Sequence, residues 1–526
     1  MLRRLLNFFS DAPSWWWQHI NNNDPTCLVL IASLLIFVLS LLNWMLFTKE
    51  SKTKHPSLPP GPRALPLVGN LLSLAPELHA HFATLARTYG SIFTLWLGQK
   101  LTIVVTSPAI AQEVLREHDA VFANRDISVA AALSSYGGRD LVWSPYGSEW
   151  RMMRKVLVRE MLSNTTLDAM YSLRRQEMRK TIGYLHSQVG SPVNVGEQMF
   201  LTALNAITSM LWGVTMKEEE RTRIGVDFRV AVAEAMELLG KANLSDFFPG
   251  LAWFDLQGLR KQMMGLVVRF NKIFDAITDK GLGLDGGQES RDFLQVLLQL
   301  KKEGDAKTPL TMTHLKVLFM DMVLGGTETT SNAIEFAMAE MMSKPEILNK
   351  AQQELDTVVG RDSIVEESHI NKLPYLNAIL KEVLRLHPVL PLMVPHCPSQ
   401  TCIIGGYTIP KGARVFINIW AIHRDPLIWK NPAEFRPERF LDGKMGFRGG
   451  DFSYFPFGSG RRMCAGIAMA ERMFLFSLAS ILHSFDWKLP EGEELDLSEK
   501  FGIVLKKRVP LMAIPTPRLS NPALYD

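Results

Sequence analysis

The sequence predicts a mainly helical fold with small β-sheets, preceded by one N-terminal transmembrane helix. Three observations support this fold class. Apolar residues recur with helical periodicity from Pro108 to about Lys381. Short strand-like runs lie on both sides of this region, and a long uncharged segment lies near the N-terminus. No repeat, low-complexity tract or flexible linker interrupts the chain after residue 55, so we expect one large domain.

The membrane anchor is predicted over residues 25–48, which contain no charged side chain. A helix of this length spans roughly 36 Å at about 1.5 Å per residue, enough to cross a hydrocarbon core of about 30 Å. A cleaved signal peptide has a shorter apolar run that starts earlier. Basic residues follow the segment between residues 49 and 63. The positive-inside rule therefore favours a lumenal position for residues 1–24 and a cytosolic position for the rest.

The elements after the anchor follow from local patterns. Residues 49–70 are basic and rich in proline, which predicts a stiff, extended hinge before the main domain at residues 71–526. Two strand-like runs flank Gly98-Gln99 and predict a hairpin. We expect helices at His79–Tyr89, Thr313–Met342 and Ile467–Leu482; strands at Ser91–Leu97, Leu101–Thr106, Thr401–Thr408 and Arg414–Ile417; and loops at Ile127–Asp140 and Ala242–Leu259.

Charge and cysteine content exclude several classes of function. The 57 basic residues face 53 acidic ones, for a formal net charge of +4, and no long basic run is present, so nucleic acid is not an expected partner. Four cysteines in 526 residues do not make a disulfide framework. The bulk of the chain therefore has the composition of a protein from a reducing compartment.

The most informative motif is Phe455-Pro-Phe-Gly-Ser-Gly-Arg-Arg-Met-Cys-Ala-Gly466. It places Cys464 behind a glycine-rich turn at the start of a predicted helix. Unpaired N–H groups at a helix start stabilise an anion, so we expect a lowered pKa and a thiolate, the form that binds metal. A buried structural cysteine is the alternative. The pattern Phe-x-x-Gly-x-Arg-x-Cys-x-Gly resembles the haem-thiolate signature of the cytochrome P450 family.

A second motif lies in the middle of the long helix expected at Thr313–Met342. Two adjacent glycines there cost a helix about 1 kcal/mol each relative to alanine. Close approach to a planar cofactor, with a local opening of the helix, would compensate this cost; tight crossing of another helix is the alternative. The stretch from Gly325 to Thr330 is similar to the family's oxygen-activation motif Ala-Gly-x-Asp-Thr-Thr, with Gly325 and Glu328 as departures. The resemblance implies that Glu328 and Thr329 relay protons.

A third resemblance concerns the scaffold. Glu382 and Arg385 are three residues apart and share one helix face. An ordinary surface pair is the default interpretation of this spacing. Together with Arg439 in Phe435-Arg-Pro-Glu-Arg-Phe440, however, they resemble the family's Glu-x-x-Arg and Pro-Glu-Arg-Phe motifs. The resemblance implies a buried ionic triad with a structural role.

The remaining cofactor contacts are also implied by the resemblance. Cys464 is expected as the axial ligand of the iron of haem b, within a loop that includes Phe457 and Gly466. Trp150 and Arg154 resemble the family's Trp-x-x-x-Arg pair, which contacts a haem propionate, and Arg462 is expected to pair with a propionate. His396 occupies a position where the family often places an Arg or His for the same role; an ordinary core histidine is the alternative. These expectations concern Cys464, Phe457, Gly466, Trp150, Arg154, Arg462 and His396.

The activity implied by this resemblance is monooxygenation. The chain looks closest to the plant microsomal group, held in the endoplasmic reticulum membrane by a single span and facing the cytosol. Electrons are expected from NADPH through an NADPH-cytochrome P450 reductase, and one atom of O2 enters a small apolar substrate. We expect a sesquiterpene, with a flavonoid or phenylpropanoid as the alternative. A reductase-independent isomerase or dehydratase is a further alternative, but such members typically lack the threonine pair; a non-catalytic haem protein is another.

Overall fold

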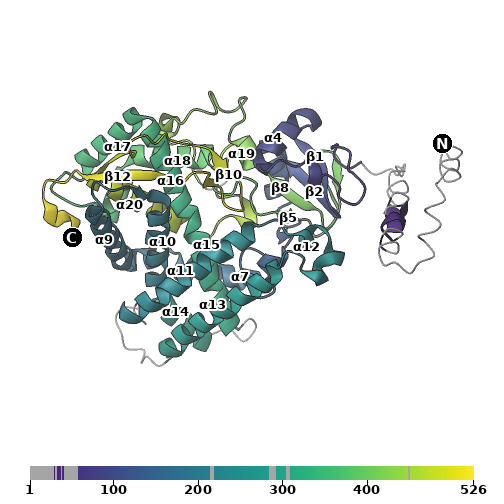
Figure 1. Ribbon diagram of the computed structural model, residues 1–526, viewed down its shortest axis with the longest axis horizontal. Helices are drawn as coiled ribbons and strands as arrows, with labels where there is room; N and C mark the ends of the chain where they lie inside the picture. Colours follow the sequence, from purple (N-terminus) through teal and green to yellow (C-terminus); the bar gives the residue numbers. More distant parts are fainter. Residues whose placement is uncertain are drawn as a thin grey trace, which may run out of the picture.

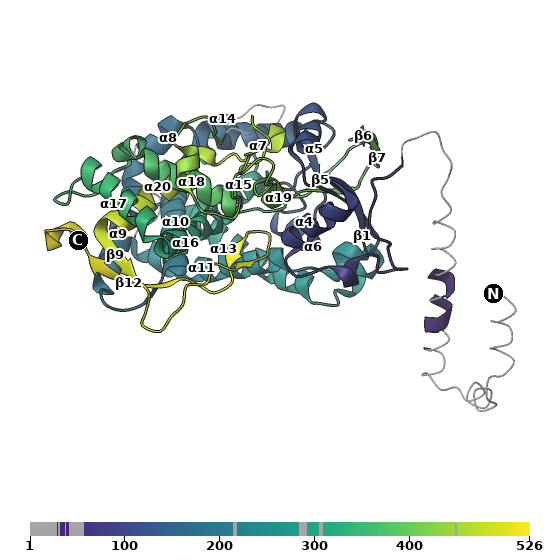
Figure 2. The same ribbon diagram turned by 90° about the horizontal axis from the view of Figure 1, so that it is seen from above.

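The computed structural model describes residues 29, 32–36, 38–40, 57–213, 218–282, 292–303, 309–447 and 450–526. Figure 1 shows a body of helices on one side and a small sheet on the other. Figure 2 gives the same arrangement from above. The helices of the body are α4 Leu78–Tyr89, α5 Pro108–Gln112, α6 Val129–Ser134, α7 Ser148–Val156, α8 Asn164–Ala169, α9 Tyr171–Ser187, α10 Val195–Trp212, α11 Glu218–Gly240, α12 Leu244–Phe247, α13 Leu259–Leu282, α14 Phe293–Glu303, α15 Met312–Gly326, α16 Glu328–Ser343, α17 Pro345–Val358, α18 Pro374–Leu386, α19 Ile419–Ile422 and α20 Ile467–Ser484.

The largest sheet has the strand order β1-β2-β8-β5-β3. The predicted hairpin forms its edge, with Ile92 opposite Val105, and β8 runs parallel to β2. At the other edge Arg125 of β3 lies opposite His396 of β5. The strands are β1 Ile92–Leu97, β2 Lys100–Val105, β3 Asn124–Arg125, β4 Val193–Asn194, β5 His396–Cys397, β6 Cys402–Ile404, β7 Tyr407–Ile409, β8 Arg414–Ile417, β9 Phe485–Lys488, β10 Glu499–Lys500, β11 Lys506–Lys507 and β12 Met512–Pro517.

Two large apolar clusters hold the helical body together. One joins α16, α18 and α20, and the other joins α10, α11, α13, α14 and α15. Helix α20 is apolar and long enough to cross a membrane, yet 72% of it is buried inside the protein. It is therefore a core helix, and its burial drives the packing of the elements around it.

Three expectations need correction. The helix expected at Thr313–Met342 is two helices, α15 and α16, which meet at Thr327. The loop expected at Ile127–Asp140 contains α6, because the Ser128 hydroxyl accepts the N–H of Ala131 and caps this helix. The loop expected at Ala242–Leu259 contains α12 and a 3-10 helix at Pro249–Phe254. In both loops the capping residue is a polar side chain of the kind that also forms turns.

The predicted anchor and hinge lie largely outside the described residues. Of residues 25–48 the structure describes only residues 29, 32–36 and 38–40, which are helical and bear exposed apolar side chains. From Ser57 on, the chain contacts the body: the carbonyl of Pro60 accepts the N–H of Thr94 at 2.8 Å, and a Cβ on Gly61 would meet the Thr94 carbonyl oxygen at 2.0 Å. The second half of the hinge segment therefore runs along β1.

Candidate functional site

The cysteine loop is a tight turn held by its own backbone. Gly458 and Gly460 have φ angles of +76° and +69°, a region that favours glycine. A Cβ on Gly460 would lie 2.4 Å from the Leu115 carbonyl oxygen, so no larger residue fits there. The N–H of Cys464 donates to the Phe457 carbonyl at 3.0 Å. These contacts fix Cys464 just before α20, as the sequence predicted.

The thiol of Cys464 faces an interior space. Its side chain is accessible to solvent, yet desolvation by surrounding protein raises the pKa of the thiol. The two observations agree because a side chain that lines an internal space has free area without reaching the outer surface. Ala465 and Ala468 beside it belong to the same apolar cluster as the side chains of α15. The cysteine loop and α15 thus pack into one apolar cluster.

The expected low pKa of Cys464 is wrong for the protein alone. The N–H of Gly466 donates to Sγ at 3.3 Å, and both this bond and the charge of Arg154 lower the thiol pKa. Burial outweighs them and leaves the pKa above its ordinary value. A metal cation that binds Sγ supplies the missing stabilisation, because coordination deprotonates a thiol.

The glycine pair marks the junction of α15 and α16, and its two members do different things. A Cβ on Gly325 would meet nothing within 4 Å, so this residue opens onto free space. A Cβ on Gly326 would lie 2.7 Å from Ile207 Cδ1 of α10, so this residue allows close helix packing. Tight helix crossing therefore explains Gly326, while approach of a planar cofactor at Gly325 stays a prediction. The Thr329 hydroxyl donates to the Gly325 carbonyl at 2.6 Å, at the edge of the free space.

Glu328 begins α16 and is buried. Its carboxylate forms an ion pair with the ammonium group of Lys506 on β11. No local sequence pattern points to Lys506, because it lies 178 positions after Glu328. The packing of β11 against α16 in the folded chain brings the two side chains together.

Arginines gather beside the cysteine loop. Arg462 donates from Nε to the Ala123 carbonyl at 2.6 Å and from Nη1 to the Leu141 carbonyl at 3.0 Å. Arg154 donates to the Met463 carbonyl at 2.8 Å. The indole N–H of Trp150 also donates to the Leu141 carbonyl, at 3.1 Å, and the Arg462 guanidinium lies 4.7 Å from the centre of the Trp150 ring. The structure thus brings the three predicted side chains together.

A third arginine joins them, and sequence reasoning missed it. Arg125 of β3 is surrounded by protein, and burial together with the charge of Arg462 lowers its pKa to about 9. Its Nη1 donates to the Val394 carbonyl at 2.6 Å. No local pattern singles it out, because Asn124 and Asp126 flank it in a mixed polar stretch. The pairing of β3 with β5 places it next to His396.

This cluster carries more positive than negative charge. Burial lowers the pKa of Arg462 to about 10 and also lowers that of Arg154, while Asp140 is the acid that acts on both Arg462 and Arg125. Asp140 itself is buried, and desolvation raises its pKa to about 7. Buried charges are stable only when paired. The cluster therefore suits a bound dianion.

His396 adds an unused donor or acceptor to the cluster. Its Nδ1 lies 2.8 Å from the Phe122 carbonyl, whereas its Nε2 is buried without a partner. Desolvation and the charge of Arg125 hold the imidazole pKa well below its ordinary value. A buried nitrogen without a partner requires an explanation, and a bound polar group would satisfy it.

The scaffold residues Glu382, Arg385 and Arg439 are in contact. Arg385 donates twice to Glu382, at 2.7 and 2.8 Å, and both side chains are fully buried. Arg439 Nε lies 3.3 Å from the same carboxylate, which also accepts the N–H of Arg436 at 2.8 Å. Arg385 further donates to the carbonyls of His423 and Pro432. The group thus fixes the segment that precedes the cysteine loop to α18.

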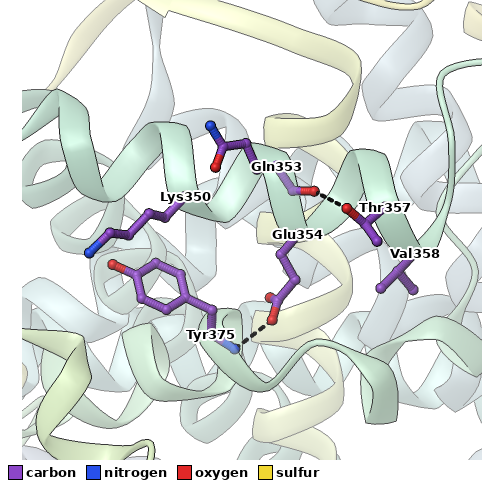
Figure 3. A pocket seen from close by; sticks show the side chains of 6 residues that line it. All are labelled: Lys350, Gln353, Glu354, Thr357, Val358 and Tyr375. Atoms are coloured by element: carbon purple, nitrogen blue, oxygen red, sulfur yellow. Dashed lines mark hydrogen bonds between the residues drawn. The ribbon is translucent and has the colours of Figure 1, made fainter.

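A separate groove on the surface between α17 and α18 has a volume of about 370 Å³ (Figure 3). Its polar groups have partners: Glu354 accepts the N–H of Tyr375 at 2.7 Å, and Thr357 donates to the Gln353 carbonyl at 2.8 Å. Glu354 therefore acts as a cap for the first turn of α18. The groove shares no residue with the cysteine site.

The cysteine site fits haem. Among the described residues no group of three or more His, Cys, Asp and Glu side chains could hold a metal ion, so a metal at Cys464 needs other ligands. A porphyrin would supply them, its two propionates would supply the dianion, and Gly325 leaves the helix junction open, since a Cβ there would meet nothing within 4 Å. Cys464 would hold the iron. Arg125, Arg154, Arg462 and His396 are the side chains available to the propionates.

Comparison with known proteins gives one family. The family model described as Cytochrome P450 matches residues 59–513. A flavonoid 3'-monooxygenase of Crocosmia x crocosmiiflora is 39% identical over 92% of this chain and 97% of its own. A flavonoid 3'-monooxygenase of Petunia hybrida is 38% identical (94% and 99%), and a geraniol 8-hydroxylase of Swertia mussotii is 40% identical (90% and 95%). A zebra fish cytochrome P450 solved with abiraterone aligns with a TM-score of 0.70 at 27% identity, covering 84% of this chain and 99% of that one.

Proposed function

The chain belongs to the cytochrome P450 family and is a haem-thiolate monooxygenase, and from this premise we propose that it hydroxylates a flavonoid. The observation that carries the substrate class is the near full-length similarity to enzymes named flavonoid 3'-monooxygenase, at 38–39% identity. The sesquiterpene expected from the sequence has weaker support, because no relative described above is named for one. The geraniol 8-hydroxylase, at 40% identity, makes a small terpene alcohol the second candidate.

Each predicted side chain has a role in this proposal. Bound haem activates O2 with electrons that a reductase supplies. Cys464 would hold the iron, and Arg125, Arg154 and Arg462 would bind the propionates. Glu328 and the Thr329 hydroxyl hold and pass protons at the mouth of the helix junction, where Thr329 contacts the Gly325 carbonyl. The apolar cluster around α15 keeps water away from the substrate.

The cellular setting is part of the proposal. The uncharged residues 25–48 anchor the chain in the endoplasmic reticulum membrane, and the catalytic domain faces the cytosol. An NADPH-cytochrome P450 reductase in the same membrane delivers the electrons. Support comes from the composition of the N-terminal segment and from the absence of any nucleotide-binding glycine motif in the sequence.

Turnover in microsomes that contain a plant reductase tests the proposal. Flavonoids, geraniol and sesquiterpenes are offered separately, and products are identified by mass spectrometry under isotopically labelled O2. A hydroxylated flavonoid that carries one labelled oxygen atom is expected. In the Thr329→Ala variant, NADPH consumption should continue while product per NADPH falls by about tenfold or more. Turnover of geraniol or a sesquiterpene without any flavonoid product would contradict the substrate class.

A further inference from the structure

The ion pair between Glu328 and Lys506 joins two parts of the chain with different tasks. Glu328 begins α16, beside the helix junction, and its side chain is 8% exposed. Lys506 lies on β11, and its side chain is 46% exposed. A long, half-exposed lysine loses considerable rotamer entropy when it is held in one place. The buried carboxylate therefore depends on a positive partner for its stabilisation, whereas the half-exposed ammonium group of Lys506 is also stabilised by water.

Two further polar residues of α16 fasten the same segment. Asn332 Nδ2 donates to the Leu505 carbonyl at 3.1 Å, and Glu335 accepts the N–H of Leu511 at 2.8 Å. Glu328, Asn332 and Glu335 are spaced by four and three residues, so they share one face of the helix. This face forms a polar seam between α16 and the chain from Leu505 to Leu511.

The other strand of the hairpin is held by a different set of side chains, one of which, His387, also contacts Glu340 of α16 at 2.9 Å. Glu499 of β10 accepts a bond from His387 Nδ1 at 2.7 Å and from the Trp420 indole at 2.9 Å. It also pairs with His79 and Arg424, at 3.1 Å each. Four side chains therefore fix β10 to the body, while β11 is held by the polar seam, by the Leu505 N–H on the Val389 carbonyl and by Lys507, which donates to the Asp496 carbonyl. The lysine of β10, Lys500, lies directly opposite Lys506 in the hairpin.

The tip of this hairpin is joined to the segment that follows α18. Residues Phe501–Leu505 connect the two strands, and Val504 is buried. The N–H of Leu505 donates to the Val389 carbonyl at 2.8 Å. One short segment thus contacts both the chain after α18 and the polar face of α16.

We propose that Lys506 is a positioning residue for Glu328 that ties the proton-relaying carboxylate to the hairpin Glu499–Lys507. This inference rests on the proposed monooxygenase function and deepens it. When the ion pair is formed, the Glu328 carboxylate stays at the junction of α15 and α16 beside Thr329. A displacement of the hairpin tip then displaces the carboxylate as well. Misplacement of a catalytic group by about 1 Å costs up to about a hundredfold in rate. Product formation should therefore depend on Lys506 although Lys506 contacts no substrate.

The test compares Lys506→Met, Lys506→Arg and the control Lys500→Met in the full-length, haem-loaded enzyme with reductase. Lys500 forms no ion pair among the residues that the structure describes, so its loss should leave product per NADPH unchanged. We expect Lys506→Met to lower product per NADPH by about tenfold or more, at unchanged haem content and with a small change in KM. Lys506→Arg should restore most of the loss. An unchanged ratio of product to NADPH in Lys506→Met would overturn the proposal.

A second readout does not depend on activity. Hydrogen–deuterium exchange of residues 499–511 and of the first turn of α16 should lose protection in Lys506→Met and Glu328→Gln to the same extent, and no further in the double variant. Additive losses, or exchange equal to wild type, would show that the two side chains act separately. Should the wild type yield no product from any substrate, the proposed function fails, and the exchange measurement alone still decides the role of Lys506.

Discussion

Glu382→Gln is the change whose effect on stability follows most directly from the structure. Glu382 and Arg385 are both fully buried, and the carboxylate accepts two bonds from Arg385, one from the N–H of Arg436 and one from Arg439. The amide keeps the shape of the side chain but turns one acceptor into a donor that faces a guanidinium. Breaking a buried pair in this way costs about 3–5 kcal/mol. We expect the free energy of unfolding to fall by that amount.

Chemical denaturation of the haem-loaded protein, followed by circular dichroism and by haem absorbance, measures this loss. Glu438→Gln is the matched control, because Glu438 pairs with Lys350 at 2.8 Å while the two side chains are 32% and 54% exposed. An exposed pair contributes about 0–1 kcal/mol. If the two variants lose the same stability, the argument that burial makes the Glu382 group a structural anchor is refuted. Haem absorbance should be lost in Glu382→Gln at a lower denaturant concentration than in Glu438→Gln.

Two other predictions concern the helix junction and the buried acid. Gly325→Ala should gain about 1 kcal/mol of helix stability and weaken haem or substrate binding in spectral titrations, whereas Gly326→Ala should gain less stability, because its Cβ would press on Ile207 Cδ1 and that side-chain end must shift; equal effects on stability would contradict this. Asp140 keeps its proton to about pH 7 when folded and to about pH 4 when unfolded, so its contribution to stability is complete below about pH 4 and is lost as the pH rises to about 7. Asp140→Asn should therefore flatten the decline of unfolding free energy over this range, and an unchanged pH profile would argue against a buried, protonated Asp140.

Features set by neighbouring residues were predictable from the sequence. The cysteine loop, the β1–β2 hairpin and α20 follow from turn residues and from apolar periodicity, which act within one or two turns of the chain. The contact between Glu382 and Arg385 follows from their spacing of three residues on one helix face. Even the opening at the glycine pair was expected, although its exact position at Thr327 was not.

Features set by distant segments were not predictable. Arg125 becomes part of the basic cluster through the pairing of β3 with β5, and Lys506 reaches Glu328 because β11 lies on α16. The pKa of Cys464 was predicted in the wrong direction, since the helix start was visible in the sequence while the depth of burial was not. Burial and strand register both depend on the whole fold.

Ligation of haem iron by Cys464 is the central claim, and the reduced carbon-monoxide difference spectrum of purified variants tests it most directly. The wild type and Cys402→Ser should show the same band, the one that thiolate ligation gives, because Cys402 lies on β6 outside the site. Cys464→Ser should lose that band while the protein remains folded by circular dichroism. A thiolate band that survives in Cys464→Ser would contradict the assignment of the axial ligand and of the site built around it.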